Sequence, residues 1–478
     1  MFSVAQDFSI FSIFLHIERK DFFMAKNSTK NMTEGSPAKL ILGFALPMLV
    51  GMLFQQIYNF VDTIIVGRYL GVNALAAVGS TGSIHFLIIG FCIGTCSGFT
   101  LPVAQRFGAK DYDGLRKYVG NSAILAAIIS VAMAILTALL CRNILEWMQT
   151  PADIIDDAYD YIFVTFIGIP AIMLYNLLSG YIRALGDAVT PVIYLLISSF
   201  LNIGLDILFI VPMQMGVLGA ALATVLAQLV SGLLCLLHIY FKFDILHLDK
   251  DDLRLYPQYV RIILSMGLPM GLQYSITAIG SVILQACVNP LGSLAVAAMT
   301  ASGKITNFLM CPLEALGSTM ATYSGQNVGA GKLERLGKGL KSAIIIGWIY
   351  SAIALGISYF FGDSMISIFV EANDPAVKAQ VIHQGYLCLV IGQAAYGLLT
   401  LVNTVRFTIQ GMGFSGFAVF AGVAEMFARA LVGIILVPLF GFTGACFAGP
   451  AAWVFADAFL IPAYYSCYNK LKRIIHRA

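Results

Sequence analysis

Charge is what this sequence has least of. Only 11% of its 478 residues are Asp, Glu, Lys or Arg, whereas 59% are hydrophobic. A soluble domain of this length carries about 25% charged residues, so the chain has too little polar surface to cover a globule in water. The scarcity excludes an ordinary soluble protein. It predicts instead an all-α membrane protein that crosses the bilayer many times.

The sequence also lacks the motifs of membrane-embedded enzymes and of ATP-driven pumps. Its six histidines are scattered, and no His-Glu-x-x-His cluster is present. The Gly-rich stretch Gly325–Lys332 has the wrong spacing for a phosphate loop, and Leu333 stands where that loop needs Ser or Thr. Cys92 and Cys96 are four residues apart, but no His or carboxylate in the same span joins them as a metal ligand. We therefore expect neither an enzyme nor a bound cofactor.

The first 38 residues read as a mixed, cytoplasmic N-terminal tail. The apolar run Phe8–Ile17 is too short to span a membrane, and no small-residue cleavage site follows it. Met24 opens a polar stretch that leads into the first span. Met24 is therefore an alternative start of translation.

Between residues 39 and 468 the chain contains twelve apolar segments of about 20 residues or more, each long enough to cross the hydrocarbon core. The most polar internal stretch, Lys242 to Tyr256, separates the sixth segment from the seventh. The predicted organisation is a tail (1–38), an N-lobe of six helices (39–241), a cytoplasmic linker (242–257), a C-lobe of six helices (258–468) and a cytoplasmic tail (469–478).

The distribution of basic residues supports this count. With the N-terminus in the cytoplasm, 23 of the 28 Lys and Arg residues fall on the inner side and 3 on the outer side. Lys304 and Arg429 lie within spans, and the inner count includes Arg183 and Arg406, each the only basic residue of its loop. The positive-inside rule predicts this asymmetry for twelve spans with both termini in the cytoplasm. We expect a multi-pass protein of the plasma membrane.

The two halves resemble each other in sequence. The matching segments are Ala45–Pro47 with Gly267–Pro269, Leu70–Ala77 with Leu291–Ala298, Gln105 and Gly108 with Gln326 and Gly329, and Gly216–Ala220 with Gly441–Ala445. Because each half holds six spans, both copies enter the membrane in the same orientation. Parallel repeats of this kind are one architecture of secondary transporters.

A carboxylate stands where the first span should cross the bilayer. An ionisable group at the centre of a membrane helix costs about 2.5–3.5 kcal/mol on insertion scales. Such a residue is tolerated where it faces a polar cavity, a partner or a transported ion. Tyr58 lies one turn before Asp62 and Gln55 about one turn earlier, so the three share a face. The alternative is a polar seam that only holds helices together.

Motifs spread over residues 32–470 resemble the multidrug and toxic compound extrusion (MATE) transporters. They are Asn59–Gly67 with Leu70-Gly71, Arg183–Asp187 followed by Thr190-Pro191, Asn202–Asp206, Gly219–Thr224, Ala301–Lys304, Gln326–Lys332 and Gln410–Gly413. The resemblance implies twelve transmembrane helices in two six-helix lobes, related by pseudo-two-fold symmetry and forming a V. It also implies export of organic cations and drugs by proton or sodium antiport through alternating access. We expect a monomer in the lipid bilayer, with small-molecule substrates and no nucleic acid.

The same resemblance implies a coupling site in the N-lobe. Matched residue by residue, the coupling positions are Asp62, Asp206, Asn202, Tyr58, Asn176, Thr224 and Tyr161. Two carboxylates in a poorly hydrated pocket cannot both ionise without cost, so such a pair is suited to carry a proton. Together with the amide oxygen of Asn202, the oxygens of Asp62 and Asp206 would equally suit Na⁺. The ion therefore stays open between H⁺ and Na⁺, and no firm metal site is predicted.

The seventh and tenth spans indicate the branch of the family. The sodium-coupled NorM-like branch has acidic residues in both, whereas here Gln273, Tyr274 and Thr277 occupy the seventh and the tenth has no carboxylate. A DinF-like branch with coupling through the N-lobe fits this pattern better.

Four further polar residues are candidates for the substrate cavity: Gln55, Glu314, Glu425 and Lys304. Glu425 and Arg429 are one turn apart, so a structural ion pair explains Glu425 as well as a cavity does. Lys304 lies near a helix end, where its side chain could reach the interface. The alternative function is a flippase for lipid-linked precursors from the wider superfamily. Transport of an anionic substrate would favour that alternative.

Overall fold

The computed structural model describes residues 31–370 and 374–475, and all regular structure in these ranges is helical. The predicted tail therefore falls mostly outside the described residues, as do Met24 and the run Phe8–Ile17. In chain order the helices are α2 (Pro37–Leu70), α3 (Val72–Ser80), α4 (Gly82–Gly108), α5 (Tyr112–Trp147), α6 (Ile155–Ile167), α7 (Ile169–Ala184), α8 (Val189–Ile210), α9 (Gly216–Lys242), α10 (Pro257–Val288), α11 (Ser293–Gly329), α12 (Leu333–Ser367), α13 (Pro375–Ala394), α14 (Tyr396–Gly411), α15 (Gly416–Leu431), α16 (Val437–Cys446) and α17 (Ala448–Ile475).

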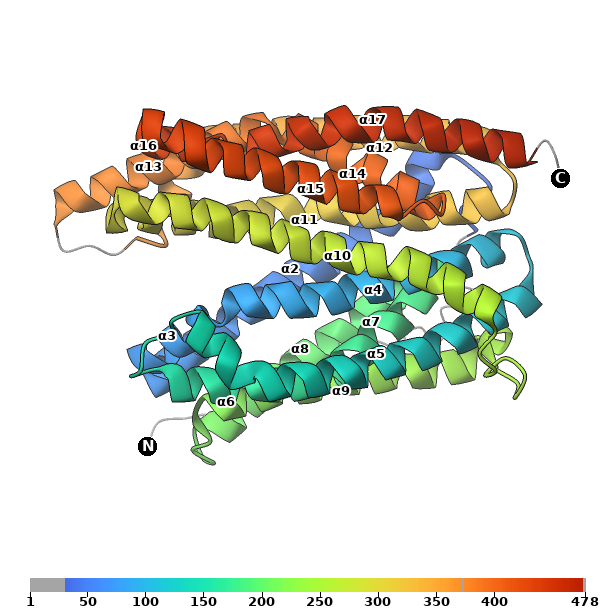
Figure 1. Ribbon diagram of the computed structural model, residues 1–478, viewed down its shortest axis with the longest axis horizontal. Helices are drawn as coiled ribbons and strands as arrows, with labels where there is room; N and C mark the ends of the chain where they lie inside the picture. The colour runs from blue at the N-terminus through green and yellow to red at the C-terminus, as the bar shows by residue number, and fades with distance from the viewer. Residues whose placement is uncertain (1–30, 371–373, 476–478) are drawn as a thin grey trace, which may run out of the picture.

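The long helices are the predicted membrane spans. Within the described residues, nine helical runs are long and apolar enough to cross a bilayer, and the pairs α6–α7 and α13–α14, bent by 45° and 50°, each provide one more span. α17 runs beside them as the twelfth crossing (Figure 1). The first bend lies at Gly168, where Pro170 in the first turn of α7 has no amide hydrogen to donate. The sequence pattern did not predict either bend.

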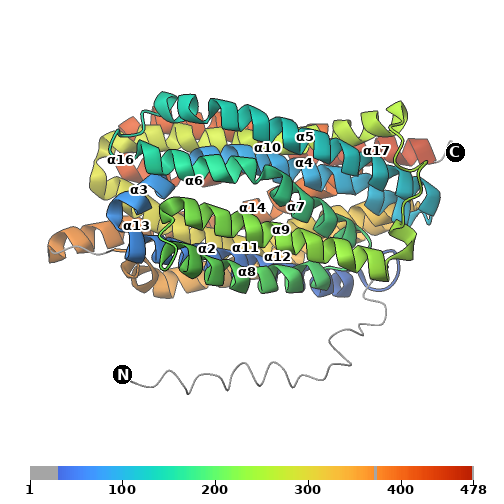
Figure 2. The same ribbon diagram turned by 90° about the horizontal axis from the view of Figure 1, so that it is seen from below.

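The helices form two lobes that diverge into a V. In Figure 1 helices α10–α17 lie above most of α2–α9, and the lobes converge toward the side that carries the C-terminus. We call this side the linker end, because it also carries the connection between α9 and α10, and we call the opposite side the far end. Figure 2 shows α7 between the α5–α6 pair and the α8–α9 pair. Both bent spans are the fourth crossing of their lobe, which agrees with the internal repeat.

Small residues allow the lobes to touch along α4 and α10. A Cβ added to Gly98 would lie 2.5 Å from the Cα of Gly267, and one added to Gly94 would lie 2.6 Å from the carbonyl oxygen of Met270. The two backbones are therefore in direct contact, as glycine permits between membrane helices. This contact joins the two lobes.

The first span connects the two lobes. Ile41, Phe44 and Met48 of α2 are buried in one apolar cluster with C-lobe residues such as Tyr323 and Leu460. The later turns of α2 instead pack against α3, α8 and α9, with Val66 buried among them. α2 thus starts on the C-lobe and ends in the N-lobe.

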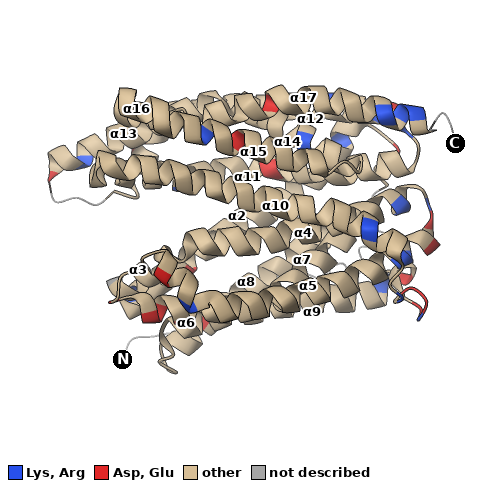
Figure 3. Cartoon of the chain, viewed as in Figure 1, with Lys and Arg blue, Asp and Glu red and all other residues tan. Residues whose placement is uncertain are grey.

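The outer surface matches a lipid environment. Large apolar side chains are widely exposed on it, including Leu139 at 75% and Phe360 at 77%. Figure 3 shows Lys and Arg residues gathered at the linker end, with few along the middle of the helices. A surface of this kind is stable in a bilayer and not in water.

Candidate functional site

A cavity of about 370 Å³ lies in the N-lobe, and α10, α11 and α14 of the C-lobe contribute to its wall. Its N-lobe lining comes from α2, α4, α6, α7, α8 and α9. Five of the seven predicted coupling residues line it: Tyr58, Asp62, Tyr161, Asn176 and Thr224. Gln55 lines it as well. The volume falls in the range of small-molecule sites.

Two carboxyl groups lie together at the cavity: Asp62 lines it, and Asp206 is buried beside Asp62. Asp62 of α2 and Asp206 of α8 lie close enough to influence each other, although 143 residues separate them in the chain. Asp206 is fully buried, and neither of its carboxylate oxygens has a hydrogen-bond donor among the described residues. No Lys or Arg of that part of the chain forms an ion pair with either group. Because ionised carboxylates only accept hydrogen bonds, two carboxyl groups this close could bond to each other only with a proton on one of them.

Hydroxyl and amide groups surround this pair. Tyr58, one turn before Asp62, interacts with Asp62 and with Gln55 and Gln228. Tyr161 of α6 faces both carboxyl groups. Polar neighbours of this kind can hold a proton or a small hard cation between the carboxyl groups.

The remaining predicted residues lie close by. Asn202 donates to the hydroxyl of Thr224 at 3.4 Å, and its own carbonyl oxygen has no donor. It lines a small pocket beside the cavity together with Tyr58 and Gln228. Asn176 donates to the carbonyl of Ile172 at 2.8 Å and lines the cavity. The structure thus brings the predicted residues into one region, and their coupling role remains a prediction.

Sequence reasoning missed Gln228 and Arg183. Gln228 lies one turn after Thr224 on α9, and its carbonyl oxygen is buried without a donor. The four-residue spacing from Thr224 was a signal that could have identified it. Arg183 was counted as a cytoplasmic loop residue, but the structure places it at the end of α7, lining the cavity.

The other cavity candidates lie elsewhere. Glu425 is buried in the C-lobe, where it pairs with Arg406 of α14 and, at 3.4 Å, with Arg429. Arg406, also counted as a loop residue, is therefore a buried partner inside a span, with 6% of its surface exposed. Glu314 of α11 has an exposed side chain near Tyr274, a residue of the cavity wall. The ammonium of Lys304 lies 5.7 Å from the ring centroid of Phe60 and so joins α11 to α2.

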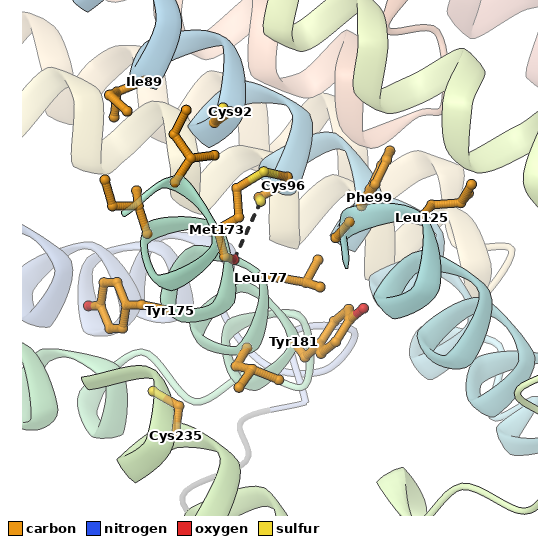
Figure 4. Packing of buried hydrophobic residues seen from close by; sticks show 14 of the residues in the cluster. Ile89, Cys92, Cys96, Phe99, Leu125, Met173, Tyr175, Leu177, Tyr181 and Cys235 are labelled. Atoms are coloured by element: carbon orange, nitrogen blue, oxygen red, sulfur yellow. Dashed lines mark hydrogen bonds between the residues drawn. The ribbon is translucent and has the colours of Figure 1, made fainter. Parts of the chain in front are cut away.

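The cysteines behave as small apolar residues. Cys92 and Cys96 are fully buried in the cluster between α4 and α7, where the thiol of Cys96 points at the carbonyl of Met173 at 3.6 Å (Figure 4). Burial in an apolar cluster explains their place in the sequence without any reaction or ligand.

Two equivalent hydrogen bonds close the linker end. Gln105 of α4 donates to the carbonyl of Gly411 at 2.9 Å, and Gln326 of α11 donates to the carbonyl of Ala184 at 2.9 Å. These glutamines are the matching positions of the internal repeat. Gln326 also accepts a hydrogen bond from the backbone of Met32 at 3.0 Å. We call Gln105 and Gln326, with the carbonyl groups that they bind, the linker-end latch.

Glycines make the latch possible. A Cβ added to Gly108 would lie 2.0 Å from the carbonyl oxygen of Gln326, and one added to Gly329 would lie 1.7 Å from that of Gln105. Real Cβ atoms do not approach other heavy atoms so closely. The two helix ends therefore cross with their backbones in contact, and the linker end is shut.

A cavity beside two carboxyl groups, inside a two-lobed membrane bundle, is an arrangement typical of secondary transporters. The MatE family model matches residues 47–208 and 269–439, and the chain belongs to this family. Its members are transporters, so the predictions of a transporter rather than an enzyme and of a MATE protein are confirmed.

Relatives and solved structures agree with this assignment. The chain is 26% identical to the probable multidrug resistance protein YoeA of Bacillus subtilis, over 77% of this chain and 80% of that protein. It is 23% identical to the multidrug export protein MepA of Staphylococcus saprophyticus, over 86% of this chain and 90% of that protein. A crystal structure of MATE in complex with MaL6 has the same fold, with a TM-score of 0.86 and 23% identity over 93% of this chain and 99% of that one.

Proposed function

We propose that this protein is a secondary active multidrug exporter that moves organic cations out of the cell in exchange for protons. The observation that carries the proposal is the close approach of Asp62, which lines the cavity, to the buried Asp206, without a basic partner among the described residues. A proton shared by the pair lowers its negative charge. Its release restores that charge, which attracts an organic cation. Proton and drug then compete for one site, and this competition is what antiport requires.

Alternating access would depend on the linker-end latch. The latch closes one end of the cavity, while the lobes diverge toward the far end. The excess of basic residues at the linker end supports a cytoplasmic position for it, with both termini cytoplasmic in the plasma membrane. Drug uptake would then require the Gln105 and Gln326 hydrogen bonds to part. We propose that the lobes 39–241 and 258–468, joined by residues 242–257, move as the two bodies of a monomer that needs no cofactor.

Sodium is the alternative coupling ion. The carbonyl oxygen of Asn202 and both oxygens of Asp206 have no hydrogen-bond donor among the described residues, and oxygen atoms are the ligands of hard cations. The name of the relative MepA supports export of drugs in either case.

Efflux of the fluorescent cation ethidium from reconstituted vesicles tests the proposal, with a pH gradient or a sodium gradient imposed separately. Proton antiport predicts transport under the pH gradient alone, and loss of that transport in Asp62→Asn and in Asp206→Asn. Transport under the sodium gradient alone would identify Na⁺ as the coupling ion and would leave the proposed coupling site in place. Full activity of both variants would overturn the coupling site, and absence of ethidium transport under either gradient would favour the flippase.

A further inference from the structure

Arg183 is a cation in the cavity that forms no ion pair with any carboxylate of the described residues. Its side chain lines the cavity, and among the described residues it forms no hydrogen bond and no ion pair. Two arginines of the C-lobe, the buried Arg406 and the mostly buried Arg429, share Glu425. A charge kept away from bulk water is costly unless an opposite charge compensates it. Arg183, half-buried at the cavity, is therefore the member of this group whose charge is left open to a ligand.

Its position at a helix end does not explain this arrangement. Arg183 lies in the last turn of α7, and a cation at a helix C-terminus gains typically 0.3–1 kcal/mol from the helix dipole. A side chain directed to the solvent beyond the helix would gain the same energy. The helix dipole therefore does not explain why the Arg183 guanidinium lines an internal cavity.

The internal repeat provides a comparison. In the C-lobe the position of Arg183 is occupied by Gln410, which donates to Gln273 at 2.8 Å. The glycines that follow, Gly186 and Gly413, have φ angles of 93° and 94°, so both backbones turn in the same way. In the N-lobe, Gly51 stands at the position of Gln273 and has no side chain to accept a hydrogen bond. Arg183 thus stands where the C-lobe has a glutamine with a hydrogen-bond partner. The N-lobe has no side chain at the position of that partner.

We propose that Arg183 binds an acidic group, a carboxylate or a phosphate, of the transported molecule. The guanidinium offers paired N–H donors that fit both groups. Asp62 lies toward the far end of α2 and Arg183 at the linker end of α7, so one elongated ligand can contact both. The cavity therefore takes amphoteric molecules, with the basic part at Asp62 and the acidic part at Arg183. This inference rests on the proposed function and assigns the residue that would contact an acidic group of its substrate.

A matched pair of dyes tests the inference. Rhodamine 123 is a cationic methyl ester, and rhodamine 110 is the corresponding free acid, so the two differ only at the group that Arg183 would bind. Dissociation constants are measured by fluorescence anisotropy on the full chain in lipid nanodiscs, for the wild type, Arg183→Gln and Arg183→Lys. The readout is the ratio of the two constants. The ester reports whether each variant still holds its cavity.

Arg183→Gln should weaken binding of the acid, relative to binding of the ester, by about 10- to 100-fold. This is the contribution of a hydrogen bond to a charged group. Arg183→Lys keeps the charge and should recover most of this preference. An unchanged ratio in Arg183→Gln would overturn the inference, as would a wild type that binds the ester and not the acid, while either result leaves the proposed function in place. Arg183-dependent binding of the acid, without gradient-driven efflux of ethidium, would support the inference and refute the proposed function.

Discussion

Alanine at Gly108 or Gly329 should force the linker end open. The added Cβ would lie 2.0 Å from the carbonyl oxygen of Gln326 or 1.7 Å from that of Gln105, and both obstacles are backbone atoms. Reaching an ordinary contact distance moves the helices apart by about 1 Å or more. The two latch bonds, each 2.9 Å long, would then exceed hydrogen-bonding distance.

The magnitude follows from these contacts. Each neutral hydrogen bond contributes about 0.5–1.5 kcal/mol, and overpacking costs about 1–3 kcal/mol. Together they destabilise the closed linker end by about 2 kcal/mol or more, which shifts the conformational equilibrium at least ~30-fold. A transporter that cannot close this end should lose most of its transport.

Distances between spin labels measure the effect. Labels on the exposed residues Tyr112 and Lys338 report the separation of the lobes at the linker end, in a background without the native cysteines. Gly303→Ala is the matched control, because it lies on α11 like Gly329 and its added Cβ meets nothing within 4 Å. Label distances and transport in Gly108→Ala and Gly329→Ala that equal those of Gly303→Ala would refute the latch.

Two other substitutions test the polar groups inside the lobes. Glu425→Gln leaves Arg406 and Arg429 buried without a counter-charge, and should lower the unfolding free energy by about 3–5 kcal/mol, seen as a lower melting temperature. Asp156→Asn, which removes an exposed partner of Arg142, should change the melting temperature little, because solvent screens an exposed ion pair. Equal shifts in both variants would contradict the burial argument. Gln228→Leu removes a neighbour of Tyr58 beside Asp62 and should reduce gradient-driven ethidium transport several-fold, whereas the exposed Gln258→Leu should not. Equal transport in these two would place Gln228 outside the coupling site.

The sequence allowed prediction of the spans because an apolar run of about 20 residues has few alternatives to a membrane helix. Residues on one helix face, such as Tyr58 and Asp62, could also be grouped from their spacing. The repeat between the halves pointed to two similar lobes. Each of these signals is local or periodic, so it can be recognised in a single sequence.

Contacts between distant segments were beyond such reasoning. The pairing of Glu425 with Arg406 depends on how α14 and α15 pack, and Arg406 alone resembled a loop residue. Arg183 was misplaced for the same reason, since a basic residue just before a loop has the same pattern whether it turns inward or outward. The contact of Asp62 with Asp206 could be expected only through the family resemblance, because nothing local joins α2 to α8.

Proton release on drug binding is the most direct test of the central claim, that the Asp62–Asp206 pair exchanges a proton for an organic cation. Rhodamine 123 is titrated into the protein in nanodiscs near neutral pH, in weakly buffered solution with a pH indicator. The wild type should release up to one proton for each dye molecule bound, and Asp206→Asn should release none. Dye binding by the wild type without proton release, or the same release from Asp206→Asn, would contradict the account.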